Sequence, residues 1–164
     1  MTNRHRLQAA LAAAALAAAL GTTVYLWWPS GPVEAGLLRP DDAQTVRLGE
    51  SLYREHCAAC HGINLEGETS EWQVRDADGY LPAPPHDETG HTWHHADQLL
   101  FAMTKYGIAE AANLPDYQTR MPPYDGILED EEIVAILSYI KAAWPPHVRQ
   151  YQDDINRRSA GRPR

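Results

Sequence analysis

Two cysteines spaced three positions apart and followed at once by a histidine constrain this 164-residue chain more than any other feature. The stretch is Cys57-Ala58-Ala59-Cys60-His61, and the chain has no other cysteine. A disulfide between Cys57 and Cys60 would close too small a loop to stabilise a fold. C-x-x-C-H is the attachment signal for a c-type haem, because two thiols on one helical turn can form thioethers while the next residue offers its imidazole to the iron.

Two other kinds of site use paired cysteines. A dithiol redox site with C-x-x-C spacing needs a β-α-β surround, which the pattern of this chain does not show. A zinc site needs further ligands with their own spacing. We therefore expect one covalent haem c, with Cys57 and Cys60 as the thioether residues and His61 as an axial ligand of its iron.

The N-terminal segment is apolar and is considered apart from the fold. Arg4 and Arg6 precede an apolar run from Leu7 to Trp28, which as a helix would be about 33 Å long and could span a bilayer. Its length and terminal aromatic residues favour an anchor over a cleaved signal peptide, although its alanines offer cleavage sites. We expect residues 1–28 to anchor the chain in the lipid of a bacterial inner membrane, with the rest on the periplasmic side. A soluble periplasmic protein, after cleavage, is the alternative.

The remainder of the chain is acidic and long enough for one small domain. Without Arg4 and Arg6 it has 12 basic and 22 acidic residues, a balance that argues against nucleic acid as a partner. Residues 29–40, with three prolines and two glycines, predict a linker. A single domain is expected over residues 41–146. The polar residues 147–164 predict a mobile tail.

Apolar periodicity predicts three helices in this domain. The first, residues 41–59, can be capped by Asp41 or Asp42. The second covers residues 95–106 and stops at Gly107, and the third covers residues 129–143 with an acidic first turn. Helices this short, joined by long loops, bury too little apolar surface for a core of ~100 residues, so a haem must fill the middle.

On these motifs the chain resembles the class I cytochrome c family, over roughly residues 45–144. The resemblance implies an all-α domain of three main helices and long loops wrapped round one haem, behind the N-terminal transmembrane helix. It also implies that the first and last helices cross, with Gly49 and Tyr53 meeting Ile136 and Tyr139. The matching stretches are Leu48–Tyr53, Cys57–Gly62, Met121–Tyr124 and Ile133–Lys141.

The second axial ligand is predicted to be Met121. The family places its methionine in a proline-rich loop just before the last helix, which is where Met121 lies in this chain. A thioether stabilises ferrous iron and closes the coordination sphere, which favours electron transfer. Met103 is the competitor, but it shares an apolar helix face with Leu99 and Leu100, so packing accounts for it.

Two further features lie between the motif and the second helix. The loop 79–85 resembles the family's proximal loop, in which a proline carbonyl accepts a hydrogen bond from the axial histidine. Pro84 or Pro85 can serve, and a stiff turn without that role is the alternative. Four histidines follow, and copper or zinc, a haem propionate, helix capping or solvent exposure would each account for them. They are His86, His91, His94 and His95.

Together these features predict an electron carrier and not an enzyme. We expect a membrane-tethered protein that passes single electrons between or within respiratory or photosynthetic complexes. A haem subunit of a larger oxidoreductase is an alternative, and the short linker favours such a short-range role. A haem peroxidase is a further alternative, which requires an open sixth site on the iron.

Overall fold

The computed structural model describes residues 36–161, and every regular element in that range is helical. Three helices lie where the sequence predicts them, so the all-α expectation is confirmed for this part of the chain: α2 (Ala43–His56), α4 (Asp97–Tyr106) and α6 (Asp130–Ala143). Three short pieces accompany them: α3 (Ala58–His61), the 3-10 helix η1 (Thr92–His94) and α5 (Ile108–Ala111). A longer helix, α7 (Pro146–Ala160), lies where the sequence predicts none.

No helix within residues 36–161 is long and apolar enough to cross a membrane. The predicted anchor, residues 1–28, lies outside the described residues, as does the first part of the predicted linker.

Helix α2 starts at a side-chain cap and ends where the cysteine motif begins. The Asp42 carboxylate accepts hydrogen bonds from the Gln44 backbone N–H at 2.9 Å and the Thr45 hydroxyl at 2.7 Å. The sequence predicts that this helix continues to residue 59, but it breaks at Cys57, whose φ of −120° and ψ of −37° are not helical. The break gives the motif its own single turn, α3.

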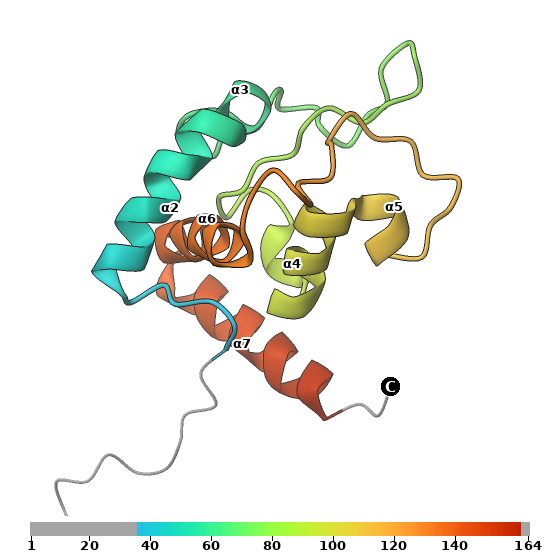
Figure 1. Cartoon of the computed structure of the whole chain (residues 1–164). Helices are drawn as coiled ribbons and strands as arrows, with labels where there is room; N and C mark the ends of the chain where they lie inside the picture. The colour runs from blue at the N-terminus through green and yellow to red at the C-terminus, as the bar shows by residue number, and fades with distance from the viewer. Residues whose placement is uncertain (1–35, 162–164) are drawn as a thin grey trace, which may run out of the picture. The chain divides into compact units, whose positions relative to one another are not determined.

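Helices α2 and α6 cross in close contact, as Figure 1 shows. A Cβ atom on Gly49 would lie only 1.9 Å from the Ala135 carbonyl oxygen and 3.0 Å from the Tyr139 Cβ. The rings of Tyr53 and Tyr139 lie 5.5 Å apart. Ile136, three residues before Tyr139 on α6, is buried in the core. The predicted crossing is therefore present, with the Ala135 backbone as the closest neighbour of Gly49.

Helix α6 is the most buried element of the described chain. Its start is fixed by a capping box, in which the Glu132 side chain accepts from the Glu129 backbone N–H at 2.9 Å. Its predicted end is confirmed, because Trp144 leaves the helical conformation before the two prolines that follow. Most of its side chains are buried, among them Ile133, Ile136 and Ile140. This helix forms the centre on which the other elements pack.

The expectation of a mobile tail over residues 147–164 is wrong for most of that range. Residues 146–160 form α7, which begins with Pro146 in the first turn, a position where proline's missing N–H costs nothing. Val148 joins the hydrophobic core and Gln152 is fully buried. The last three residues lie outside the described range.

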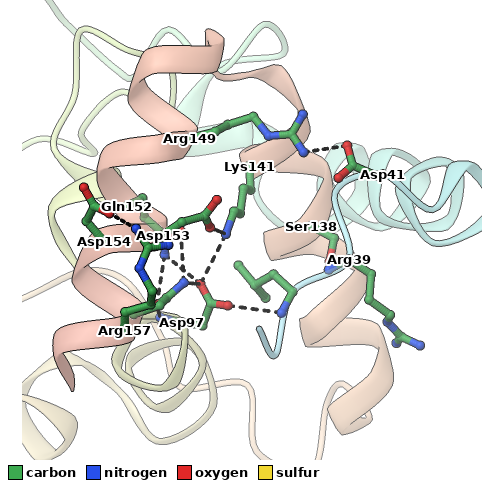
Figure 2. A network of polar contacts seen from close by, with 12 residues as sticks. Arg39, Asp41, Asp97, Ser138, Lys141, Arg149, Gln152, Asp153, Asp154 and Arg157 are labelled. Atoms are coloured by element: carbon green, nitrogen blue, oxygen red, sulfur yellow. Dashed lines mark hydrogen bonds and ion pairs between the residues drawn. The ribbon is translucent and has the colours of Figure 1, made fainter. Parts of the chain in front are cut away.

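A buried polar network, centred on Asp97 at the start of α4, holds α7 in place (Figure 2). The Asp97 carboxylate is fully buried and accepts from Gln152 Nε2 at 2.6 Å and Asn156 Nδ2 at 2.9 Å. The Lys141 ammonium of α6 lies 3.9 Å from it and donates to Asp153 at 2.6 Å. Polar partners thus hold α7 in addition to the apolar contact of Val148 with the core.

The predicted linker is shorter than residues 29–40, because its last residues pack on the domain. Leu38 is buried in the core, and its backbone N–H donates to Asp97 at 3.2 Å. The Arg39 N–H donates to the Ser138 hydroxyl of α6 at 2.9 Å. A Cβ on Gly36 would lie 2.8 Å from the Asp97 carboxylate. The folded domain therefore extends beyond the predicted 41–146 at both ends.

Candidate haem site

The single turn α3 presents the two thiols and the histidine of the motif. The Cys57 carbonyl accepts from the N–H groups of Cys60 at 3.1 Å and His61 at 3.0 Å, which closes the turn. Both cysteines are free thiols; Cys57 is half-buried and Cys60 is exposed. Burial raises the pKa of the Cys57 thiol to about 11, so this sulfur is protonated at neutral pH. Gly62 ends the turn with a φ of 78°, which suits a residue without a side chain.

Two buried tyrosines hold the turn from either side. The Tyr53 hydroxyl of α2 donates to the Gly62 carbonyl at 2.8 Å, just after the motif. The Tyr124 hydroxyl donates to the His56 carbonyl at 2.7 Å, just before it. Burial raises the pKa of both phenols, which keeps them protonated as donors. The role of Tyr124 was not predicted, because it joins segments 68 residues apart.

The imidazole of His61 is buried and oriented by a backbone carbonyl. Its Nδ1 lies 2.9 Å from the Pro84 carbonyl oxygen. Because a carbonyl can only accept, Nδ1 carries the proton and Nε2 keeps its lone pair. Burial lowers the pKa of His61, which favours this neutral form. Of the two prolines that the sequence offers for this contact, the structure selects Pro84.

A second buried imidazole, His86, stacks on His61. The two ring centroids are 4.1 Å apart and the ring planes differ by 23°. His86 Nδ1 lies 2.8 Å from the Thr92 hydroxyl, and the Trp144 indole N–H donates to the His86 carbonyl at 2.7 Å. Burial, together with the nearby His61, lowers the pKa of His86 well below its usual value, so its ring is neutral. Sequence reasoning grouped His86 with the three histidines that follow it, left its role open, and did not predict this contact.

The other three histidines of that cluster lie on aromatic neighbours. The His91 ring stacks on Trp72 at 5.2 Å, and the His94 ring stacks on Trp93 at 3.7 Å. His91 and His95 meet edge to face at 5.2 Å. Within residues 36–161 no three His, Cys, Asp or Glu side chains are grouped so that they could hold a metal ion. The described geometry therefore offers no second metal site.

Both methionines of the domain pack against the hydrophobic core. Met103 lies on α4 and Met121 in the loop before α6, and each is half-buried. The Met121 N–H donates to the Thr119 hydroxyl at 3.0 Å. Two prolines follow Met121 and fix the backbone up to Tyr124, whose N–H donates to the Thr104 carbonyl at 3.0 Å. Packing alone does not distinguish the two thioethers.

The thiols and the imidazole nitrogen of α3 that have no partner within residues 36–161 are the groups that a covalently attached haem requires. Two unlinked thiols lie three residues apart, and the Nε2 lone pair of His61 has no hydrogen-bond partner among the described residues. Trp93 Nε1 is the single buried side-chain nitrogen or oxygen of the described residues without a partner, but its ring lies against His94 and Tyr151 and no contact links it to α3. The residues present fit the cofactor that the motif predicts.

An all-helical domain with a cysteine-cysteine-histidine turn, whose histidine is neutral and oriented by a backbone carbonyl, is typical of the class of c-type haem proteins. The family model described as cytochrome c matches residues 46–144, a range that begins within α2 and includes α3 to α6. The chain belongs to this family. Comparison with curated proteins and with solved structures returned no match.

Membership of the family establishes the general function of the protein, namely haem binding and electron transfer. The protein binds a c-type haem covalently, with iron as its metal, and is a haem-binding electron-transfer protein. Cytochrome c domains typically work outside the cytoplasm, in the periplasm or beyond. The matched residues end at 144, so α7 lies beyond the part that the family model describes.

Proposed function

We propose that this protein is a membrane-tethered electron carrier with His/Met ligation of one haem. Cys57 and Cys60 would form the thioethers, and His61 Nε2 and the Met121 sulfur would be the two protein ligands of the iron. The bound haem supplies an iron that alternates between the ferric and ferrous states. The observation that carries the proposal is the 2.9 Å contact between His61 Nδ1 and the Pro84 carbonyl, since it directs Nε2 to act as a ligand.

The residues of the chain perform three tasks in this function. Pro84 fixes the tautomer and the orientation of His61, and a hydrogen-bonded axial imidazole is a more basic ligand. Tyr53 and Tyr124 hold the α3 turn so that the two thiols keep their spacing. With His61 and Met121 both as ligands, the iron would have no open site for oxygen or peroxide while the thioether stays bound, which favours electron transfer over oxidase or peroxidase chemistry.

Met121 ligation is tested by comparing two alanine variants of the ferric protein. The long-wavelength sulfur-to-iron absorption band should be present in the wild type and in Met103→Ala, and absent in Met121→Ala. Met103→Ala should instead lose about 2–5 kcal/mol of unfolding free energy, the usual cost of truncating a core methionine. A band that is lost in Met103→Ala but kept in Met121→Ala would overturn the assignment.

A tightly bound haem subunit of a larger oxidoreductase is the second candidate. The packing of residues 36–40 on the domain supports it, because it shortens the predicted tether to residues 29–35 and with it the reach of the haem. Detergent extraction followed by size-exclusion chromatography separates the two. A free carrier elutes as a single small species, whereas a subunit elutes with its complex.

A haem peroxidase would need an open sixth position on the iron. High-spin ferric iron and rapid peroxide turnover in the unmutated protein would establish it in place of the carrier.

Membrane attachment through residues 7–28 is part of the proposal and is supported by the apolar run in the sequence. The partners are then membrane redox complexes on the periplasmic face. Full-length protein should stay in the membrane fraction through a high-salt wash and be released by detergent. A soluble product that begins after an A-x-A site would establish a cleaved signal peptide instead.

A further inference from the structure

Two loops that are far apart in sequence meet beside Met121. One runs from α3 towards η1 and contains Asp76 and Tyr80; the other runs from α5 to α6 and contains Met121 (Figure 1). They are joined by Arg120, the residue directly before the predicted ligand. None of the functions assigned above uses this junction.

The first loop forms a rigid, self-bonded turn around one carboxylate. Asp76 Oδ1 accepts from the N–H groups of Asp78 at 3.0 Å and Tyr80 at 2.9 Å. The Asp76 N–H donates to the Tyr80 carbonyl at 2.8 Å. Gly79 has a φ of 87°, a backbone conformation that closes the turn and strains residues with a side chain. The turn therefore holds Asp76 Oδ2 and the Tyr80 ring in fixed positions.

The Arg120 guanidinium makes three contacts with this turn. Nη1 donates to Asp76 Oδ2 at 2.5 Å, and Nη2 lies 3.3 Å from Asp78 Oδ2. The guanidinium carbon lies 4.2 Å from the centroid of the Tyr80 ring, within cation–π range. The hydrogen bond to Arg120 lowers the pKa of Asp76, so the carboxylate stays charged at neutral pH. A planar guanidinium can make all three contacts at once, which an ammonium cannot.

Arg120 is the attachment of the Met121 loop on its N-terminal side. In the part of the chain that the structure describes, residues 115–119 make no hydrogen bond outside their own loop. After Met121, the two prolines and Tyr124 secure the chain to α4 and to the end of α2. Met121 thus lies between a fixed segment on one side and a segment held through Arg120 on the other.

We propose that Arg120 is a positioning residue, which uses the Asp76–Tyr80 turn to keep the Met121 sulfur on the iron. The inference rests on the proposed ligation by Met121. A thioether is a weak ligand of ferric iron, so the motion of its loop decides how often the site opens. Arg120 restricts that motion from outside the site without contacting the iron itself.

The test measures cyanide binding to the purified ferric holoprotein, because cyanide enters only when the sulfur leaves. Arg120→Ala should bind cyanide faster by on the order of tenfold, the combined effect expected for an ion pair and a cation–π contact. Asp76→Asn should act in the same direction, and Arg120→Lys should fall between wild type and Arg120→Ala. Once Arg120 is alanine, Asp76→Asn should add little, because the two residues act through one contact.

Arg54→Ala is the matched control. The Arg54 side chain is 53% exposed, against 52% for Arg120, and it also makes an ion pair, with Glu50 at 2.8 Å. It lies on α2, and among the described residues it makes its ion pair with Glu50 of the same helix and none with either loop, so its variant should bind cyanide at the wild-type rate.

The outcomes separate the inference from the proposed function. A wild-type protein without the sulfur-to-iron band would overturn Met121 ligation and the inference together. A wild-type protein with the band, whose Arg120→Ala and Asp76→Asn variants bind cyanide at the wild-type rate, would overturn the inference alone. Equal acceleration by Arg54→Ala would also overturn it, since loss of any surface arginine would then suffice.

Discussion

Helix α6 is held by two neighbours in two different ways. Against α2 it packs through backbone contact and aromatic rings, with Gly49 directly over the Ala135 carbonyl. Against α7 it is held through the buried polar group around Asp97 and Lys141. We expect the α2–α6 interface to be sensitive to added side-chain volume, and the α6–α7 interface to be sensitive to the loss of a hydrogen-bonding or charged partner. The difference shows that one helix can be fixed by shape on one side and by hydrogen-bond chemistry on the other.

Removing the haem attachment should weaken both interfaces at once. Cys57→Ser together with Cys60→Ser is expected to leave little folded protein, because the ligand that stabilises the native state is lost and the centre of the domain is left unfilled. Mass spectrometry and circular dichroism measure the bound haem and the remaining helix content. A double variant with wild-type helix content would show that the two interfaces suffice without the cofactor.

Asp97→Ala should disrupt the polar interface between α6 and α7 and leave the interface between α2 and α6 intact. It leaves the buried groups of Gln152, Asn156 and Leu38 without their acceptor, at a cost of about 3–5 kcal/mol of unfolding free energy. Amide hydrogen exchange should accelerate in α7 more than in α2. Asp154→Asn is the control, because within residues 36–161 the partner of that carboxylate is Arg157 of the same helix, at the surface. Equal acceleration in both helices would mean that the interfaces are not independent.

Gly49→Ala should break the interface that depends on shape. The new Cβ would lie 1.9 Å from the Ala135 carbonyl, so the helices must separate. We expect a loss of about 3 kcal/mol from overpacking, partly offset by about 1 kcal/mol of better helix propensity. Gly161→Ala, whose Cβ would have its nearest neighbour at 3.9 Å, should be close to neutral in chemical denaturation. A stabilised Gly49→Ala variant would contradict the close crossing.

Acidification should weaken the α7 side through His95, in addition to the effect of the other histidines whose pKa burial lowers, and this is the smallest effect. The carbonyl of His95 accepts from Gln152 Nε2 at 3.1 Å, and burial lowers the pKa of its ring. The unfolded state then binds more protons below about pH 6.5, so the full stability is present above that pH and declines as the pH falls towards the folded pKa. Corrected hydrogen exchange in α7 should quicken between pH 7 and pH 5. In His95→Gln that dependence should be shallower, and an unchanged dependence would exclude His95 as its source.

Apolar periodicity predicted α2 and α6 as helices, whereas their crossing was implied by the resemblance to a known family. Apolar periodicity did not predict α7, because its buried Gln152 and half-buried Asn156 are polar residues, and only the folded chain shows that both bond to Asp97. The spacing of Val148, Gln152 and Asn156 on one helix face was the signal available.

In the candidate haem site, too, some residues could be predicted from the sequence and others could not. Cys57, Cys60 and His61 follow from a local motif, and the contact from Pro84 follows from a resemblance over a short loop. The stacking of His86 on His61 and the bond from Tyr124 to His56 join residues that only the folded chain brings together. Met121 ligation stays a prediction, because both methionines pack against the core.

The meeting of both ends of the described chain at Asp97 has a mechanical consequence. Gly36 and Leu38 approach this carboxylate from the N-terminal side, and α7 approaches it from the C-terminal side. Tension applied to the chain ahead of Gly36 is therefore carried first by the Leu38 and Arg39 hydrogen bonds to α4 and α6. Under load those two hydrogen bonds bear the force first, and the force reaches the turn that carries Cys57 and His61 only after they have broken.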